Sequence, residues 1–413
     1  MNILLINHYA GSVYHGMEFR PHYLAREWVK HGHHVNIVAA SYSHVRTNNP
    51  EMAGLSRTDE MIDGIHYTWL STPLYKGNGI WRLLNITAFI CRLYRQSNDI
   101  ASRTAPDAVI ASSTYPLDIF PARRIARQAK ARLFFEVHDL WPLSPIELGG
   151  YSRWHPFMML LQFAENHACR NADAVVSILP NAKEHLEKHG MAPKKLHVVV
   201  NGADAAEWNA DTPAPPLALS ACLFSIQSSG LFIVGYTGSH GPANALIYFL
   251  DAAYLLRDHP VAFVLVGGGS EKSKLQDRAL ALGLSKVYFF DAIPKSQVPE
   301  LLRRIDLTYI GWQRQPLYRF GISPNKLVDY MMAGRPILHA VEAGNDLVGD
   351  ARCGVTITPE NPEKIADAIL DIMIMSPEAR SEMGQRGRRF ALENLSYSVL
   401  GRRFLHVLSG DNA

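Results

Sequence analysis

The stretch LFIVGYTGSHGPANALIYFLDAAYLLRDHPVAFVLVGGG, residues 231–269, decides the fold. It starts with an apolar run that ends in glycine, continues with a helical pattern near 244–257, and closes with a second apolar run and three glycines. A strand, a helix and a second strand in this order form a βαβ unit, whose parallel strands are buried on both faces. The stretch therefore predicts an α/β protein.

The same alternation of strand and helix patterns extends in both directions. Further strands are predicted at 3–7, 35–40, 107–112, 132–137, 173–179, 196–200, 287–291, 306–310 and 336–340, and a helix at 19–31. The alternation is interrupted at 210–230, where DTPAPP is typical of a connector. Two Rossmann-like domains that face each other across a cleft are therefore expected.

The predicted boundaries follow from this break and from the last helical pattern. An amino-terminal domain is expected at 1–205 and a carboxyl-terminal domain at 206–395. The segment 396–413 is expected to form a helix that crosses back to the first domain. Because the chain has 413 residues and domains usually have roughly 100–200, two domains also suit the length.

Composition narrows the class of protein. Apolar residues make up 47% and charged residues 19%, as in globular proteins, and the four cysteines have no metal-ligand spacing. The start, MNILLINHYAG, predicts a strand and not a signal peptide, and no run is long enough for a membrane span. A reduced, cytoplasmic location is therefore expected.

A second informative stretch is GISPNKLVDYMMAGRP, residues 321–336. Ser323 is predicted as an N-cap with Pro324 at the first helical position, so Lys326 would lie in the first turn, where the helix dipole disfavours a cation. A diphosphate bound by the amides near Ser323 and Asn325 would offset that cost, with Asp329 binding ribose hydroxyls. The alternative is a surface Lys–Asp pair.

Glycine-rich turns after predicted strands supply further candidates for a phosphate site. They contain Gly16, Gly238 with His240, and Gly267 with Gly268. Ligands of open α/β sheets bind at the carboxyl ends of the strands, where such turns lie. Because no GxGxxG motif is present, a nicotinamide or flavin site is disfavoured.

The ordered motifs resemble family 4 of the retaining GT-B glycosyltransferases, also called group 1. The similarity covers Gly16 and Arg20 followed by LAREWVKHGHHVNIV, ENHACRNADAVVSILPNAKEHL with VVVNGAD, and then VGYTG, VLVGGG and SPNKLVDYMMAGRPIL. Two departures concern the site. Gly321 and Asp329 stand where the family has the two acids of E-x7-E, and Ser239 and Asn244 replace its diphosphate-binding Arg and Lys. The pattern is similar to the subgroup with P-x-K and [DE]-Y-M-x-x-G, in which Lys326 supplies the cation.

The resemblance implies how the reaction would run. Transfer with retention would place charge on the departing diphosphate, which Lys326 and the helix amides would stabilise. His138 and Asp139, at the end of a strand, are candidate catalytic residues near the transferring sugar. Arg20, His44 and Arg46 are candidate acceptor-binding residues. Backbone amides at 321–323 would replace the missing acid. No metal and no cofactor are expected, only a nucleotide sugar, most simply a UDP-sugar.

A basic, amphipathic segment suggests a membrane partner. Residues 77–96 combine apolar side chains such as Trp81 with three arginines, and 154–165 extends the apolar surface. Ten bases against three acids give the segment 76–132 a net charge of +7. We expect peripheral binding at the inner face of the plasma membrane, the alternative being a core helix with arginines that reach the surface. Nucleic acid is disfavoured, because no aromatic residues are interleaved to stack bases.

These expectations combine into one hypothesis. The chain would transfer a sugar, with the resemblance favouring an N-acetylated amino or deoxy amino sugar, from a UDP-sugar to a glycan or polyprenyl-diphosphate-linked acceptor in bacterial surface polysaccharide biosynthesis. Two alternatives remain open. A UDP-sugar 2-epimerase shares the fold but needs acid–base carboxylates, and a non-catalytic nucleotide-sugar-binding scaffold would explain the lost residues.

Overall fold

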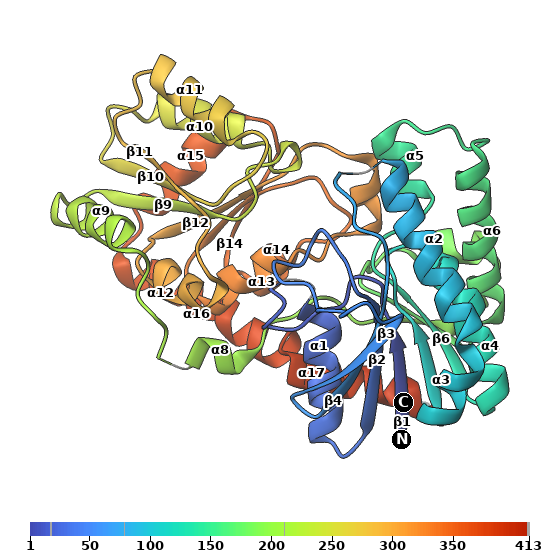
Figure 1. The fold of residues 1–413 in the computed structure, drawn as a ribbon. Coiled ribbons are helices and arrows are strands. Elements are labelled where there is room, and N and C mark those ends of the chain that lie inside the picture. The colour runs from blue at the N-terminus through green and yellow to red at the C-terminus, as the bar shows by residue number, and fades with distance from the viewer. Residues whose placement is uncertain (17–18, 78, 210, 411–413) are drawn as a thin grey trace. The chain divides into compact units, whose positions relative to one another are not determined.

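The computed structural model describes residues 1–16, 19–77, 79–209 and 211–410. The chain divides into two compact units, one formed by Met1–Val200 with Tyr397–Ala413 and the other by Asn201–Ser396. Each unit contains one twisted sheet with helices on both faces (Figure 1). The predicted α/β class with two Rossmann-like sheets is confirmed.

The first unit contains an eight-stranded sheet within its described residues, in the order β3-β4-β2-β1-β5-β6-β7-β8. The strands are β1 (Asn2–Ile6), β2 (His34–Ala40), β3 (Arg57–Ile62), β4 (Ile65–Leu70), β5 (Ala108–Ala111), β6 (Arg132–Val137), β7 (Ala174–Ser177) and β8 (Leu196–Val198). All neighbouring strands are parallel except β3 and β4.

Two helix layers cover this sheet (Figure 1). One layer contains α1 (Phe19–Lys30) and α17 (Tyr397–Ser409), and the other contains α2 (Ile80–Arg95), α3 (Ser97–Thr104), α4 (Ile119–Ala129) and α6 (Pro156–Asn171). The short helices α5 (Leu143–Gly149) and α7 (Lys183–Lys188) lie near strand ends. Alternate strand residues, such as Ile3 and Leu5, face the α1–α17 layer, as the period of two in a strand requires.

The second unit has a six-stranded parallel sheet in its described part, ordered β11-β10-β9-β12-β13-β14. The strands are β9 (Phe232–Thr237), β10 (Val261–Val266), β11 (Val287–Phe290), β12 (Leu307–Gly311), β13 (Ile337–Ala340) and β14 (Gly354–Ile357). The stretch that predicted the fold forms β9, α10 (Leu246–Leu255) and β10, with β9 and β10 paired in parallel.

Helices also cover both faces of the second sheet (Figure 1). One layer contains α10, α11 (Lys272–Ala281) and α15 (Pro362–Met373), and the opposite layer contains α12 (Val298–Arg303), α13 (Asn325–Met332) and α16 (Pro377–Asn394). The remaining helices are α8 (Ala205–Asn209), α9 (Leu217–Ser228) and α14 (Leu347–Ala351). The carboxyl ends of β9, β10 and β12 therefore meet at one edge, where the predicted glycine turns lie.

Three strands, β3, β4 and β14, were not predicted. β3 and β4 form a hairpin around Asp63 and Gly64, which both have positive φ, and this Asp-Gly pair is a recognised hairpin signal. β14 is a short strand of four half-buried residues. The predicted connector at 210–230 is wrong in its second half, because α9 follows DTPAPP directly.

No helix within the described ranges is at once long and apolar enough to cross a membrane.

Candidate functional site

Two turns at the carboxyl edge of the second sheet form the floor of the candidate donor site. The amide of Gly238 donates to Val266 O at 3.0 Å, and the amide of His240 donates to Gly268 O at 2.8 Å. A Cβ atom at Gly267 would lie 1.8 Å from Gly238 O, so only glycine allows the two turns to pack this closely. Gly268 is exposed, and a Cβ atom there would meet no atom within 4 Å. Unlike Gly238 and Gly267, it therefore leaves room for a ligand.

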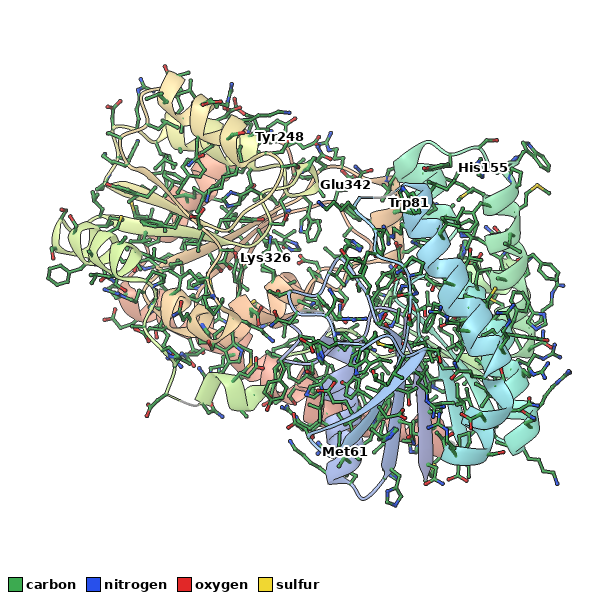
Figure 2. All side chains as sticks on the ribbon, viewed as in Figure 1. Met61, Trp81, His155, Tyr248, Lys326 and Glu342 are labelled. Carbon is green, nitrogen blue, oxygen red and sulfur yellow. The ribbon has the colours of Figure 1, made fainter. Side chains whose placement is uncertain are left out.

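Lys326, on the first turn of α13, lies against these turns (Figure 2). Its Nζ donates to Tyr236 Oη at 2.7 Å and to Asn244 Oδ1 at 3.0 Å, and it lies 4.1 Å from the centre of the Tyr236 ring. Burial lowers the pKa of Lys326 from 10.5 to about 7. Within the described ranges no carboxylate forms an ion pair with Lys326, so its only partners are neutral.

Tyr236 and Asn244 hold this lysine in place. Tyr236 Oη donates to Ser239 O at 2.5 Å, and Asn244 Nδ2 donates to the same oxygen at 2.9 Å. Both side chains are thereby fixed to the 238–240 turn, and Lys326 Cε packs against Gly238, where a Cβ atom would approach it to 2.8 Å. The result is a preorganised cation beside a helix start. At that start, the amides of Asn325 and Lys326 have no acceptor in the part of the chain that the structure describes.

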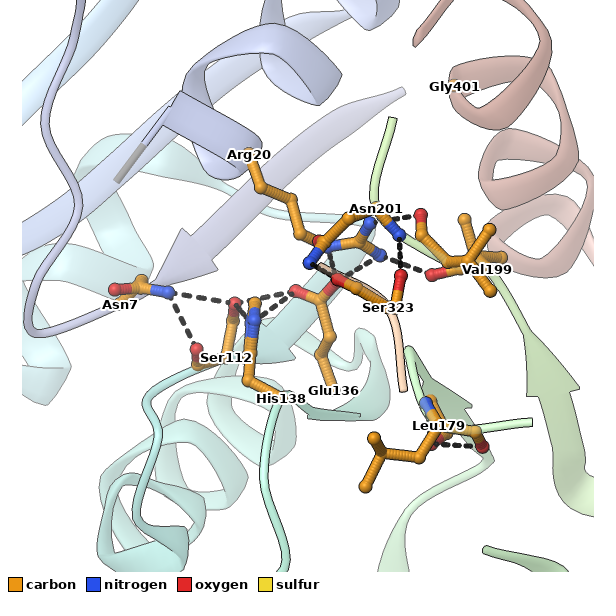
Figure 3. A network of polar contacts seen from close by, with 12 residues as sticks. Asn7, Arg20, Ser112, Glu136, His138, Leu179, Val199, Asn201, Ser323 and Gly401 are labelled. Carbon is orange, nitrogen blue, oxygen red and sulfur yellow. Dashed lines mark hydrogen bonds and ion pairs between the residues drawn. The ribbon is translucent and has the colours of Figure 1, made fainter. Parts of the chain in front are cut away.

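The beginning of α13 differs from the prediction. The helix runs over Asn325–Met332 with Pro324 in the N-cap position, and Ser323 does not cap it. Instead, Ser323 Oγ accepts from the amide of Asn201 at 2.7 Å, and Asn201 Nδ2 donates to Ser323 O at 2.7 Å (Figure 3). Ser323 lies one residue before the N-cap position. Its hydroxyl is hydrogen-bonded to Asn201 and not to an amide of the helix.

The backbone before α13 explains the missing acid of the family motif. Gly321 has φ 89° and ψ 168°, a conformation that is essentially restricted to glycine. The predicted use of amides at 321–323 for the ligand is wrong for two of them. The amide of Gly321 donates to Tyr318 O at 2.9 Å, and that of Ile322 donates to Asn345 Oδ1 at 2.7 Å.

His240 is fully buried, with a side-chain exposure of 0%. Neither ring nitrogen has a hydrogen-bond partner in the described part of the chain. Burial, together with the charges of Lys272 and Lys326, lowers its pKa to about 4. The imidazole is therefore neutral at pH 7 and packs below the turn near Tyr236 and Phe289, without direct access to solvent.

Asp329 lies one helical turn beyond Lys326 but does not share its partners. Burial raises the pKa of Asp329 to about 6, and the nearby charges are Lys295, which lowers it, and Glu207, which raises it. Lys295 and Glu207 form an ion pair with each other at 3.0 Å. The Asp329 carboxylate thus has no protein hydrogen bond in the described residues and is a free acceptor for hydroxyl groups.

In the first unit, a buried network joins two predicted residues, Arg20 and His138, through Glu136 (Figure 3). Arg20 Nε and Nη2 donate to Glu136 Oε1 at 3.0 and 2.9 Å. Ser112 Oγ donates to Glu136 Oε2 at 2.6 Å and lies 3.0 Å from His138 Nε2, which is 3.3 Å from the same carboxylate oxygen. Burial alone would raise the pKa of Glu136, but the charges of His138 and Arg20 outweigh it and lower this pKa to about 2.

Three predicted residues have structural roles instead of the expected ones. Arg20 is 5% exposed and also donates to Val199 O and Val200 O, so its guanidinium is not available to an acceptor. Arg46 is 4% exposed and donates to Ala40 O and His8 O. Asp139 accepts from Leu140 N, Trp141 Nε1 and Ser144 Oγ, and so holds the turn after β6. Arg20 and Arg46 are thus buried and Asp139 half-buried, and each is hydrogen-bonded to nearby protein groups.

His44 is exposed and belongs to an aromatic cluster at the end of β2. Its Nδ1 lies 2.6 Å from Tyr75 Oη, and its ring packs edge-on to Tyr9. Arg82 Nη2, from α2, donates to Tyr9 Oη at 3.0 Å. Gly16, by contrast, lies in a turn packed against Thr47, whose Oγ1 would be 2.7 Å from a Cβ atom.

Several residues of these sites were not selected from the sequence. Glu136 could have been identified from the sequence, because a carboxylate inside the apolar run RLFFEV is costly to bury unless it is paired. Asn201 lies in the quoted VVVNGAD motif, but its contact with Ser323 spans 122 residues of sequence. Tyr236, Tyr9 and Tyr75 had no signal, because an aromatic residue near a strand end is equally typical of a core.

Comparisons with known families add to this geometry. The family model described as "Glycosyl transferase 4-like domain" matches residues 15–202, and the model described as "Glycosyl transferases group 1" matches residues 232–374. The first match lies almost entirely in the first unit and the second match lies in the second unit. Together they cover most of the chain.

Curated relatives are bacterial. The chain is 25% identical over 59% of its length to alpha-D-kanosaminyltransferase of Streptomyces kanamyceticus, of which the match spans 61%. It is 23% identical over 70% of its length to the putative colanic acid biosynthesis glycosyl transferase WcaI of Escherichia coli, of which 70% is covered. A third relative is the probable glycosyltransferase WbjE of Pseudomonas aeruginosa, at 22% identity over 69% of this chain and 71% of the relative.

Solved structures share the whole fold. The Anabaena protein HepE in complex with UDP and glucose has a TM-score of 0.67 at 16% identity, with 100% of both chains covered. Sucrose-phosphate synthase from Thermosynechococcus elongatus has a TM-score of 0.72 at 14% identity, covering 99% of this chain and 98% of the other. The predicted GT-B architecture is confirmed at the level of the fold.

Proposed function

Since two glycosyltransferase family models match this chain, we propose that it is a group 1 glycosyltransferase that transfers a glycosyl group from a UDP-sugar to a glycan or polyprenyl-diphosphate-linked acceptor. In support, one relative is named alpha-D-kanosaminyltransferase, another is named a putative colanic acid biosynthesis glycosyl transferase, and HepE forms a complex with UDP and glucose. The pathway proposed for this chain is bacterial surface polysaccharide biosynthesis. The sugar proposed is an N-acetylated amino or deoxy amino sugar.

One observation carries the proposal: Lys326 is held at the start of α13, and among the described residues it has no anionic partner and the two neighbouring amides have no acceptor. A diphosphate satisfies all three groups at once. Its negative charge would compensate the Lys326 ammonium, and its oxygens would accept from the helix amides. Asp329, one turn on, would accept hydrogen bonds from ribose hydroxyls.

The proposed reaction proceeds with retention at the anomeric carbon. The bond from that carbon to the UDP oxygen breaks while the acceptor oxygen attacks from the same face, and the acceptor proton passes to a β-phosphate oxygen. Lys326 stabilises the charge that develops on the departing diphosphate, which requires no reorganisation because Tyr236 and Asn244 already hold it. His138 is proposed to contact the transferring sugar, with its ring oriented by Ser112 and Glu136.

No metal ion or cofactor is proposed for this chemistry, because Lys326 and the helix amides supply the positive charge that a divalent ion would otherwise provide. Transfer is expected to continue in excess EDTA. Loss of transfer in EDTA with recovery on addition of Mg²⁺ or Mn²⁺ would contradict this part of the proposal.

The protein is proposed to act at the inner face of the plasma membrane. Apolar residues of α2 and of the α5–α6 region are exposed, namely Ile80, Trp81, Leu83, Leu84, Tyr151, Trp154, Met159, Leu160 and Phe163. The two groups share the apolar cluster that contains Ile86 and Leu161. Beside them, Arg123, Arg124 and Arg127 line a cavity of about 470 Å³. In the described residues none of these arginines forms an ion pair with a carboxylate, and apolar side chains next to such arginines suit the headgroup region of an anionic bilayer.

Binding of UDP tests the proposed donor site directly. A ligand at 100 times its dissociation constant adds about 2.7 kcal/mol to the free energy of unfolding, and UDP is expected to raise Tm accordingly. In Lys326→Ala the dissociation constant is expected to rise by about 10–100-fold, since a hydrogen bond to a charged group contributes roughly 1.5–3 kcal/mol.

Lys274→Ala is the matched control, because it removes an exposed lysine from the same unit. Equal UDP binding in Lys326→Ala and the wild type would contradict the donor site. Binding of UDP without transfer to any acceptor would favour the non-catalytic scaffold, and isomerisation of a UDP-sugar without an acceptor would favour the epimerase.

A further inference from the structure

A cluster of nitrogen and oxygen ligands in the first unit lies outside the proposed transfer chemistry. Glu165 on α6, His185 on α7 and His189, the residue that caps the carboxyl end of α7, each offer one ligand atom, and these atoms all lie within 4.8 Å of one another. His185 and His189 are spaced i,i+4, so both side chains project from the same face toward α6. We propose that Glu165, His185 and His189 form a site for a divalent transition-metal ion, with Zn²⁺ as its preferred occupant.

The ligand distances suit such an ion. His185 Nε2 lies 2.8 Å from Glu165 Oε1, and His189 Nε2 lies 3.9 Å from Glu165 Oε2. Ligands at about 2.0–2.1 Å from a tetrahedral zinc are separated from one another by roughly 3.3 Å, which lies between these two values. Small side-chain movements would therefore place all three atoms around one ion, after displacement of the proton that His185 shares with Glu165.

Neighbouring amides already orient the ligands. Asn166 Oδ1 lies 2.8 Å from His189 Nδ1, and Gln162 Nε2 donates to Glu165 Oε2 at 2.7 Å and to Asn166 Oδ1 at 3.0 Å. Gln162 Nε2 also lies 2.9 Å from His189 Nδ1. When His189 Nδ1 donates to Asn166, the proton is on Nδ1 and the lone pair of Nε2 faces Glu165. Hydrogen bonds to the non-ligating nitrogen and to the carboxylate are the usual support of a metal-bound His–Glu set.

The ligand types decide which metal class fits. Two imidazoles and one carboxylate suit Zn²⁺ and its neighbours in the first transition series, whereas Mg²⁺ prefers oxygen ligands and retains water. Glu165 is only 2% exposed, which distinguishes it from the surface carboxylates that often cluster without an ion. The ion would connect α6 to α7 and so stabilise the segment that contains β7. Its role is in stability, separate from the donor chemistry of Lys326.

The test is calorimetric titration of the full-length chain with ZnCl₂, after chelator treatment and removal of the chelator. One Zn²⁺ per chain is expected to bind, with a rise in Tm. His189→Gln and Glu165→Gln are each expected to weaken binding by at least about 10-fold, and Glu165→Gln keeps a side chain that can still hydrogen-bond His185. His34→Gln, which alters an exposed histidine of the same unit, is expected to bind Zn²⁺ as the wild type does.

Three results would overturn the site. They are the absence of Zn²⁺ binding by the folded wild type, unchanged binding in both ligand variants, or equally tight Mg²⁺ binding that both variants abolish. The Tm of each variant without metal shows whether it is folded. UDP binding by the same variants is expected to be unchanged, so failure of this inference and failure of the donor site give different results.

Discussion

At the scale of single residues, the protonation of Lys326 is the property most open to measurement. A lysine usually remains charged to pH values near 10, but burial among neutral partners lowers the pKa of Lys326 to about 7. A bound diphosphate would stabilise the ammonium form and raise this pKa again. Donor binding is therefore coupled to uptake of a proton above neutral pH.

The affinity for UDP is expected to fall as pH rises. Below pH 7 the free protein already carries the ammonium, so the dissociation constant is nearly constant there. Above pH 7 the dissociation constant is expected to rise, because binding must then restore the proton to Lys326. Its slope approaches about tenfold per pH unit. Titration calorimetry between about pH 7 and 8.5 measures this slope.

Lys326→Arg serves as the control for that slope, since a guanidinium stays charged over the whole range. The arginine variant is expected to bind UDP with little dependence on pH, even if its affinity is lower. An equally steep slope in this variant would show that another group is responsible.

Arg20 is expected to contribute to stability and not to acceptor affinity. Its removal takes the guanidinium partner from Glu136, which is 1% exposed, and leaves only Ser112 and His138 beside this buried charge. Arg20→Ala should therefore lower the free energy of unfolding of the first unit by about 3–5 kcal/mol. Hydrogen exchange of β6 amides measures the change, and part of it should be recovered in Arg20→Ala combined with Glu136→Gln.

The exposed Arg402 supplies the comparison, because Arg402→Ala removes the same charge from the surface of the same unit. An Arg20→Ala protein with unchanged stability and a raised KM for the acceptor would instead support the role expected from the family resemblance.

At the scale of elements, α2 has two apolar faces in different environments. Ile86, Phe89 and Leu93 are buried, while Ile80 and Trp81 at its first turn are 69% and 61% exposed. One face therefore belongs to the core, whereas the other is apolar without protein cover in the described residues, and its contact with a membrane stays a prediction. Trp81 is labelled on this helix in Figure 2.

Binding to anionic vesicles is expected to depend on that exposed face. Replacing both Trp81 and Leu84 by serine should reduce vesicle binding more than tenfold, since each buried side chain contributes roughly 1.5–3 kcal/mol. A flotation assay measures the bound fraction. Leu280→Ser, which changes an exposed leucine of α11, should have no effect. Wild-type protein that stays at the bottom of the gradient would refute membrane binding.

At the scale of the whole molecule, the end of the chain completes the first unit. Phe404 of α17 is fully buried and packs edge-on to Trp28 of α1, with ring centres 5.2 Å apart. Trp28 Nε1 donates to Gly401 O at 3.2 Å, across 373 residues of sequence. The core of the first sheet therefore includes residues of α17, which lie far from α1 in the sequence.

Phe404→Ala is expected to destabilise the first unit by about 3–5 kcal/mol, because it leaves a cavity beside Trp28. Hydrogen exchange should show faster exchange in α1, β1 and β2 and no change in β9 or β10. Leu280→Ala, at an exposed position of the second unit, is the control. Equal loss of protection in both units would contradict this assignment of α17.

The sequence by itself determined the layered α/β fold, because buried parallel strands and their covering helices leave local patterns that each segment carries alone. It also predicts a role for Lys326, since a cation in a first helical turn is unfavourable without an anion. The tertiary structure alone decided the partners of that lysine, the contact of Asn201 with Ser323, and the burial of Arg20 and Arg46. Those contacts join segments far apart in the chain, and a side chain's partners depend on which strand ends the fold brings to the same edge.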